Sequence, residues 1–182
     1  MELVGRVSAN PLPSILDAAV FDFDRAGAGL VNRPSATALA LARLEWIGGE
    51  FRPGRRLSIL PNSFMFGTQR AVAEGREALG IAPDTTPEAA VAALLAASRA
   101  LARGDQRSAQ GALAAPVFIG QGRPVLSRLN EPGAFPNAAL ASVAVRDEVA
   151  RLVAEGQFDR RVMFDTQSIG LSTTGLGPAT GY

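Results

Sequence analysis

The segment from Thr86 to Gly104 constrains the fold more than any other part of the chain. Either Thr85 or Thr86 can cap a helix, Pro87 suits its first turn, and Glu88 complements the positive helix end. Apolar residues then follow at helical spacing, namely Val91, Leu94, Leu95, Leu101 and Ala102. Ser98 interrupts this series with a side chain small enough for close helix contact. The pattern predicts a regular, closely packed helix over 86–103.

A second helix is expected from Pro34 to the glycine pair at 48–49. Its apolar stripe consists of Ala40, Leu44, Ile47 and Phe51. Further helices are expected from Asp105 to about Ala115, over a short turn at 125–129, and over 137–155. The last of these has Ala141, Val145, Val149 and Leu152 along one side.

Another helix should begin near Asn62 or Ser63, either of which would be its cap, and end at Leu79, with Gly80 as a left-handed terminating residue. Its predicted inner face is formed by Met65, Thr68, Val72 and Leu79. Gly67 and Gly75 should each weaken this helix by about 1 kcal/mol relative to alanine.

These segments predict a mainly α fold, an irregular multi-helix bundle with extended N- and C-terminal segments. The low aromatic content of 6% also favours closely packed helices over a β-sandwich. We divide the chain into an extended or irregular segment (1–33), a helical domain (34–155) and a Gly/Ser/Thr-rich tail (156–182). Residues 14–21 could form a short helix or run into a strand at 20–23. That strand could form one small pair with a strand at 161–165.

The chain lacks most of the side chains that carry out chemistry near neutral pH. It contains no histidine, cysteine or lysine, and all 18 basic residues are arginine. These absences exclude imidazole proton transfer, thiolate catalysis, Schiff bases and the lysine of a phosphate-binding loop. We therefore expect no catalytic residue, no cofactor and no metal site.

Phe21-Asp22-Phe23-Asp24 is the one string that suggests chemistry. Asp-x-Asp after apolar residues opens the haloacid-dehalogenase phosphatases, but Ala26 replaces their Thr or Val, and no later Asp-Asp pair follows. A calcium loop starting at Asp22 would need glutamate at its twelfth position, which is Arg33. We expect Asp22 and Asp24 to be solvated or paired with Arg25 and Arg33. Two facing carboxylates remain conceivable as a catalytic pair.

The charge pattern and the apolar runs bear on partners. The net charge is +1, and the arginines are spread along the chain, with the tightest groups at 52–56 and 160–161. This dispersion does not predict a nucleic-acid partner. The longest apolar run, 89–97, is far shorter than the roughly 20 residues of a membrane span. No signal-peptide pattern is visible at the start.

Four stretches of sequence resemble small, alanine-rich, exported helical proteins of GC-rich bacteria, a group without known activity. These are Leu44–Glu50, Arg76–Asp84, Ala100–Asp105 and Ala114–Phe118. The resemblance covers about two-thirds of the chain and implies a periplasmic or exported location, with the cytoplasm as the alternative. It transfers no functional residue.

We interpret the chain as a non-enzymatic structural or accessory protein that acts through protein–protein contacts or self-association, as in a subunit of a larger assembly. Its candidate contact residues are Trp46, Arg160, Arg161, Met163 and Phe164, because Trp, Arg, Met and Phe are enriched at interfaces. The alternative interpretation of Trp46 is a purely structural one, with its ring in the core or at the edge of the core. The alternative function is a small-molecule-binding protein or carboxylate-based enzyme with a pocket between helices.

Overall fold

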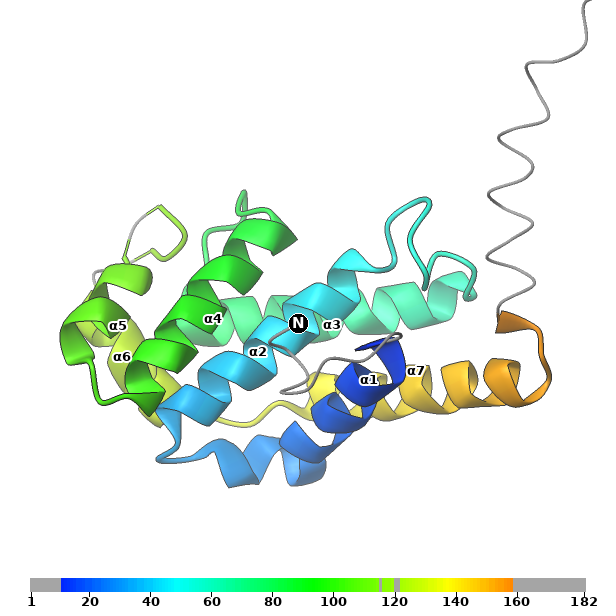
Figure 1. Cartoon of the computed structure of the whole chain (residues 1–182), viewed down its shortest axis with the longest axis horizontal. Coiled ribbons are helices and arrows are strands. Elements are labelled where there is room, and N and C mark those ends of the chain that lie inside the picture. The colour runs from blue at the N-terminus through cyan, green and yellow to red at the C-terminus, as the bar shows by residue number, and fades with distance from the viewer. Residues whose placement is uncertain (1–10, 115, 120–121, 159–182) are drawn as a thin grey trace, which may run out of the picture.

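The computed structural model describes residues 11–114, 116–119 and 122–158 (Figure 1). This part of the chain is mainly helical, as predicted. It forms α1 (Pro11–Asp22), the 3₁₀ helix η1 (Asp24–Leu30), α2 (Pro34–Gly49), α3 (Asn62–Leu79), α4 (Pro87–Ala102), α5 (Gln106–Ala112), α6 (Gly122–Asn130) and α7 (Pro136–Ala154).

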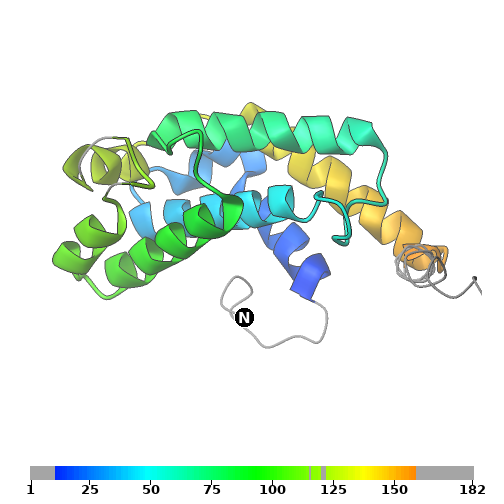
Figure 2. The ribbon, with the colours of Figure 1, turned by 90° about the horizontal axis from the view of Figure 1, so that it is seen from above.

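The central helix of the bundle is α2. Figure 2 shows α3 and α4 on opposite sides of α2, and α4 makes its most extensive contact with α2. The two helices are antiparallel, since Ser35 near the start of α2 contacts Ser98, whereas Arg52 after its end contacts Glu88. Helix α7 packs against α3 and α1, which completes the bundle.

The N-terminal segment differs from its predicted extended or irregular form. Residues 11–22 form α1, as the short-helix alternative for 14–21 predicted, and α1 buries Leu12, Ile15, Leu16 and Ala19. The 3₁₀ helix at 24–30 follows, with non-helical backbone angles at 25–27. The alternative strand at 20–23 is wrong because α1 continues to Asp22, and its expected partner at 161–165 lies outside the described residues. Among the described residues there is no strand, only one antiparallel bridge between Ile81 and Phe118.

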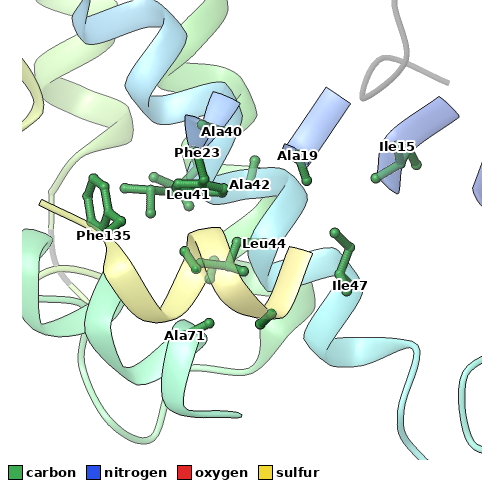
Figure 3. Close-up of a cluster of buried hydrophobic side chains, with 14 of the residues drawn as sticks. Ile15, Ala19, Phe23, Ala40, Leu41, Ala42, Leu44, Ile47, Ala71 and Phe135 are labelled. Atoms are coloured by element: carbon green, nitrogen blue, oxygen red, sulfur yellow. The ribbon is translucent and has the colours of Figure 1, made fainter. Parts of the chain in front are cut away.

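The core joins side chains of α1, α2, α3, α4, α6 and α7. Figure 3 shows Ile15, Ala19 and Phe23 facing the same cluster as side chains of α2 and as Phe135. The rings of Phe23 and Phe135 meet edge to face, with centroids 5.6 Å apart. All four residues of the predicted α2 stripe are buried, namely Ala40, Leu44, Ile47 and Phe51. The same holds for the predicted α7 stripe.

Helix α3 approaches α2 closely at two glycines, Gly75 of α3 and Gly48 of α2. A Cβ atom at Gly75 would lie 2.8 Å from Leu41 Cδ2, and one at Gly48 would lie 2.8 Å from Val72 Cγ2. Gly67, by contrast, has no neighbour within 4 Å of such an atom. The sequence predicted the end of α3 at Leu79 and the left-handed Gly80 (φ 72°) correctly. The predicted cap at Asn62 or Ser63 is wrong, because the cap position is Pro61, which provides no side-chain hydrogen bond. The packing role of Gly75 was not predicted either.

Candidate functional site

Trp46 lies in a surface groove between the C-terminal half of α2 and α4. The groove has a volume of about 480 Å³ and extends along α4 from Pro87 to Arg99. We call it the Trp46 groove. Apolar surface comes from Trp46, Val91 and Leu95, all of which are half-buried.

The rotation of α4 about its axis explains why Val91 and Leu95 reach this groove. The sequence pattern grouped them in one apolar series with Leu94, Leu101 and Ala102. In the structure, α4 turns its small residues toward the bundle and buries Ala90, Leu94, Ala97, Ser98 and Ala100, whereas Ala102 is exposed. Small side chains let two helix backbones approach closely, so the larger Val91 and Leu95 are displaced to the edge of the contact.

Trp46 also has a cationic neighbour. The guanidinium carbon of Arg56 lies 5.8 Å from the centre of the Trp46 ring, within the range of a cation–π contact. Arg56 Nε lies 3.6 Å from Glu50 Oε2, and Glu50 is only 5% exposed. The edge-of-core reading of Trp46 therefore fits its burial, while its exposed part remains available for contact at the surface.

An exposed ion pair closes one end of the groove. Arg52, in the loop after α2, binds both carboxylate oxygens of Glu88 in the first turn of α4, and it also donates to the Gly49 carbonyl oxygen at 3.2 Å. The hydrogen bond from Arg52 lowers the pKa of Glu88, and Arg55 adds to this effect by its charge.

The groove and its edge are cationic. Arg52, Arg55 and Arg99 line it together with two glutamates, and Arg56 lies above the Trp46 ring. Four arginines against two glutamates leave a local charge of +2. The basic group at 52–56 was visible in the sequence, but its position beside Trp46 depends on the loop after α2, which carries no helical pattern.

The other predicted contact residues, Arg160, Arg161, Met163 and Phe164, lie outside the described residues. Of the two aspartates in the Phe-Asp-Phe-Asp string, Asp24 pairs with Arg25 at 3.2 Å, as expected. Asp22 instead binds Arg43 of α2 at 2.5 Å, an arginine that the sequence did not connect with it. Burial raises the pKa of Asp22, and the charges of Arg43 and Arg33 offset only part of this rise.

The described residues contain neither a candidate metal site nor a candidate membrane span. Within residues 11–114, 116–119 and 122–158, no group of three or more metal-binding side chains is found. None of the helices in that part of the chain has both the length and the apolarity to cross a bilayer.

Comparison with protein-family models, curated proteins and solved structures finds no significant match. The fold and the groove define the chain as a helical bundle with an arginine-rich surface groove around one tryptophan.

Proposed function

We propose that the chain is a non-enzymatic accessory protein that binds a protein partner through the Trp46 groove. The partner segment is acidic and carries an apolar side chain. One observation carries the proposal: the only tryptophan of the chain is half-exposed in a groove whose edge holds four arginines.

The residue types in the groove match those that dominate protein interfaces. Trp and Arg are the types most enriched at binding hot spots, and a partly exposed ring beside aliphatic side chains can anchor an inserted apolar group. The charge of +2 complements an acidic segment and would steer its approach. Glu88 has a lowered pKa, so this carboxyl group of the groove is not suited to act as a general acid.

Charge complementarity also favours a separate partner over the chain's own C-terminal tail. Residues 159–182 contain two arginines and two aspartates, so their side chains carry no net charge. A second copy of the chain has a net charge of +1, so it provides no overall acidic charge to complement the groove. Both occupants are nevertheless outcomes that the experiment below distinguishes.

A peptide selection tests the proposal directly. A random peptide library displayed on phage is selected on the wild-type protein after depletion on Trp46→Ala. We expect the enriched peptides to be acidic and to contain an apolar residue. Enrichment of basic peptides, or of a sequence from the tail or another part of this chain, would overturn the proposal. The same holds if no enriched peptide binds the wild type better than Trp46→Ala.

Enriched peptides then allow a quantitative test, because fluorescence from the single tryptophan reports groove occupancy. Arg55→Glu reverses an exposed charge in the groove and should weaken binding at least about tenfold, as for charge pairs at interfaces. Arg107→Glu makes the same change at an exposed position of α5 outside the groove and should leave the affinity nearly unchanged. Equal effects of both variants would show that only the overall charge matters.

The proposal includes a periplasmic or exported location. A chain without cysteine suits either side of a membrane, so this part of the proposal rests on the sequence resemblance alone. Fractionation of native cells tests this, and recovery with the cytoplasmic markers would refute it.

A further inference from the structure

A second hollow lies on the other side of α2, between α2 and α3, and we call it the α2–α3 cleft. Its volume is about 280 Å³. Phe51, Met65, Val72 and Pro87 supply apolar walls, whereas Glu45, Thr68 and Arg76 supply polar groups. It shares only Pro87 with the Trp46 groove, and its α3 residues have no part in that groove.

A buried ion pair contributes two of these polar groups. Arg76 of α3 donates from Nε and Nη2 to the two carboxylate oxygens of Glu45 at 2.6 and 2.8 Å. Glu45 is only 3% exposed, and burial raises the pKa of its carboxyl group, an effect that Arg76 partly offsets. The two charges compensate each other, so this wall of the cleft is polar but has no net charge.

Thr68 contributes the third polar group, and its hydroxyl is unsatisfied. The residue is 1% exposed, lines the cleft, and its Oγ1 forms no hydrogen bond with any part of the chain that the structure describes. A buried hydroxyl without a partner costs roughly 1–3 kcal/mol, and most buried polar groups are therefore paired. The oxygen atom itself is covered by protein, so a molecule in the cleft can bond to it only when a neighbouring side chain moves, as side chains commonly do on binding.

We propose that the α2–α3 cleft binds a small uncharged amphipathic molecule, with an apolar body against Phe51, Met65 and Val72 and one hydroxyl or carbonyl group bonded to Thr68 Oγ1. Its volume is at the small end for ligand sites, which suits a single ring or a short chain. An anion would compete with Glu45 for Arg76, and a cation would compete with Arg76 for Glu45. A neutral ligand leaves that pair intact.

Two probes of nearly equal shape test this proposal, benzyl alcohol and ethylbenzene, which differ by a hydroxyl in place of a methyl group. Binding is followed by titration calorimetry and by NMR shifts of the Thr68 and Val72 amides and the Met65 methyl group. We expect saturable shifts with benzyl alcohol at these positions. No saturable shift with either probe would overturn the proposal.

Matched variants separate the hydroxyl contact from general effects on the fold. Thr68→Val removes the hydroxyl and keeps the shape, and it should weaken benzyl alcohol binding about threefold to tenfold without weakening that of ethylbenzene. Ser142→Ala removes the other buried hydroxyl that lacks a partner within the part of the chain that the structure describes. It lies in α7 outside the cleft, and its loss should change neither affinity. Equal effects of the two variants would overturn the role of Thr68.

A blocking variant tests the location itself. Ala73 is an exposed residue of α3 at the cleft, and Ala73→Leu should abolish binding of both probes by filling its entrance. Ala96→Leu adds the same side chain at an exposed position of α4 outside both hollows and should leave binding unchanged. Retained binding in Ala73→Leu would show that the probes bind elsewhere.

Discussion

Ser35 and Ser98 exchange hydrogen bonds across the contact between α2 and α4. The hydroxyl of each serine donates to the main-chain carbonyl of the other at 2.9 Å, and the two hydroxyl oxygens lie 3.3 Å apart. Because both side chains are short, the two helices can approach closely at this point. The pair therefore fixes the axial position of α4 on α2 without occupying the space of a larger side chain.

Substitution of Ser98 should separate the contribution of the hydrogen bond from that of the close approach of the two helices. Ser98→Ala removes one hydrogen bond and should lower the free energy of unfolding by about 0.5–1.5 kcal/mol. Ser98→Leu restores an apolar residue to the helical stripe but overfills a close contact, so it should cost about 1–3 kcal/mol or more. Urea denaturation measures both. A leucine variant as stable as the wild type would show that the contact is looser than described.

Two glycines of α3 should respond in opposite directions to alanine. Gly75→Ala forces a Cβ atom to within 2.8 Å of Leu41 Cδ2 and should destabilise the protein by about 1–3 kcal/mol. Gly67→Ala meets no neighbour within 4 Å and should stabilise it by about 0.5–1 kcal/mol through helix propensity. Thermal melts of the two variants check this. Melting shifts in the same direction would contradict the assignment of Gly75 to close packing.

The helices with strong local signals were predictable from sequence. For α4, Thr86 accepts a hydrogen bond from the Ala89 amide at 3.3 Å, and Asp105 caps α5 by accepting from the Ser108 amide at 3.0 Å. The position of Ser98 on a close helix contact was also predicted and is confirmed. Caps and apolar periodicity are local properties, so a single sequence carries them.

The features that depend on contacts between distant residues were not predictable. Helix α5 was expected to end near Ala115 but ends at Ala112. A short turn of helix was expected at 125–129, whereas α6 has nine residues. The turn after α1 holds Arg25 and Ala26 at left-handed φ angles of 48° and 56°. Tertiary contact accompanies this geometry, since the Ala26 carbonyl accepts from the Phe135 amide at 2.9 Å. No local sequence signal indicates that partner.

The same limit applies to the candidate site. Trp46 was identified by its residue type. Val91 and Leu95 were recognised only as members of the apolar series of α4, because their spacing does not specify how α4 is rotated. Thr68 was predicted to face inward, which is confirmed. The sequence could not predict that the Thr68 hydroxyl lacks a partner beside the Glu45–Arg76 pair, because this depends on how α2 packs against α3.

Asp22 gives the protein a measurable pH dependence. Burial raises its folded-state pKa above the ordinary value of 3.8, so the folded protein binds this proton more tightly than the unfolded chain does. Its contribution to stability is therefore fully present below 3.8 and is lost as the pH rises through the folded pKa. We expect the stability of the wild type relative to Asp22→Asn to fall as the pH rises above the ordinary value of 3.8.

The measurement for Asp22 is the pH slope of the difference in unfolding free energy. A constant offset between wild type and Asp22→Asn is expected as well, because the substitution leaves Arg43 without its carboxylate partner. Only the slope reports the pKa. A difference that grows with pH in favour of the wild type would show that Arg43 outweighs the burial of Asp22.

Glu74 of α3 should stabilise the start of α7. Its carboxylate accepts from the Asn137 amide at 3.2 Å and the Ala138 amide at 3.0 Å, while Phe135 at the cap position provides no side-chain hydrogen bond. Glu74→Ala should cost about 1–2 kcal/mol, as for loss of an N-terminal cap. The exposed Glu77 of α3 offers a control. Equal stability of Glu74→Ala and Glu77→Ala in urea denaturation would rule out a capping role.

The last prediction concerns where the folded core ends. The sequence assigned residues 156–182 to a tail that the core does not need, but Phe158 is only 4% exposed and belongs to the buried cluster. The Gln157 amide donates to the Leu152 carbonyl oxygen at 2.8 Å, which returns the chain toward the bundle after α7. Phe158→Ala should therefore cost about 3–5 kcal/mol.

Two truncations then separate folding from association. Deletion of 157–182 removes Phe158 and should lower the melting temperature strongly, whereas deletion of 159–182 should leave the cooperative melt nearly unchanged, because all the core residues named above remain. The shorter deletion should weaken partner pull-down, since it removes Arg160, Arg161, Met163 and Phe164. Peptides selected on the Trp46 groove should still bind it with wild-type affinity. Loss of the melt on deleting 159–182 would place further core residues in the tail, and undiminished pull-down would leave the Trp46 groove as the sole predicted contact.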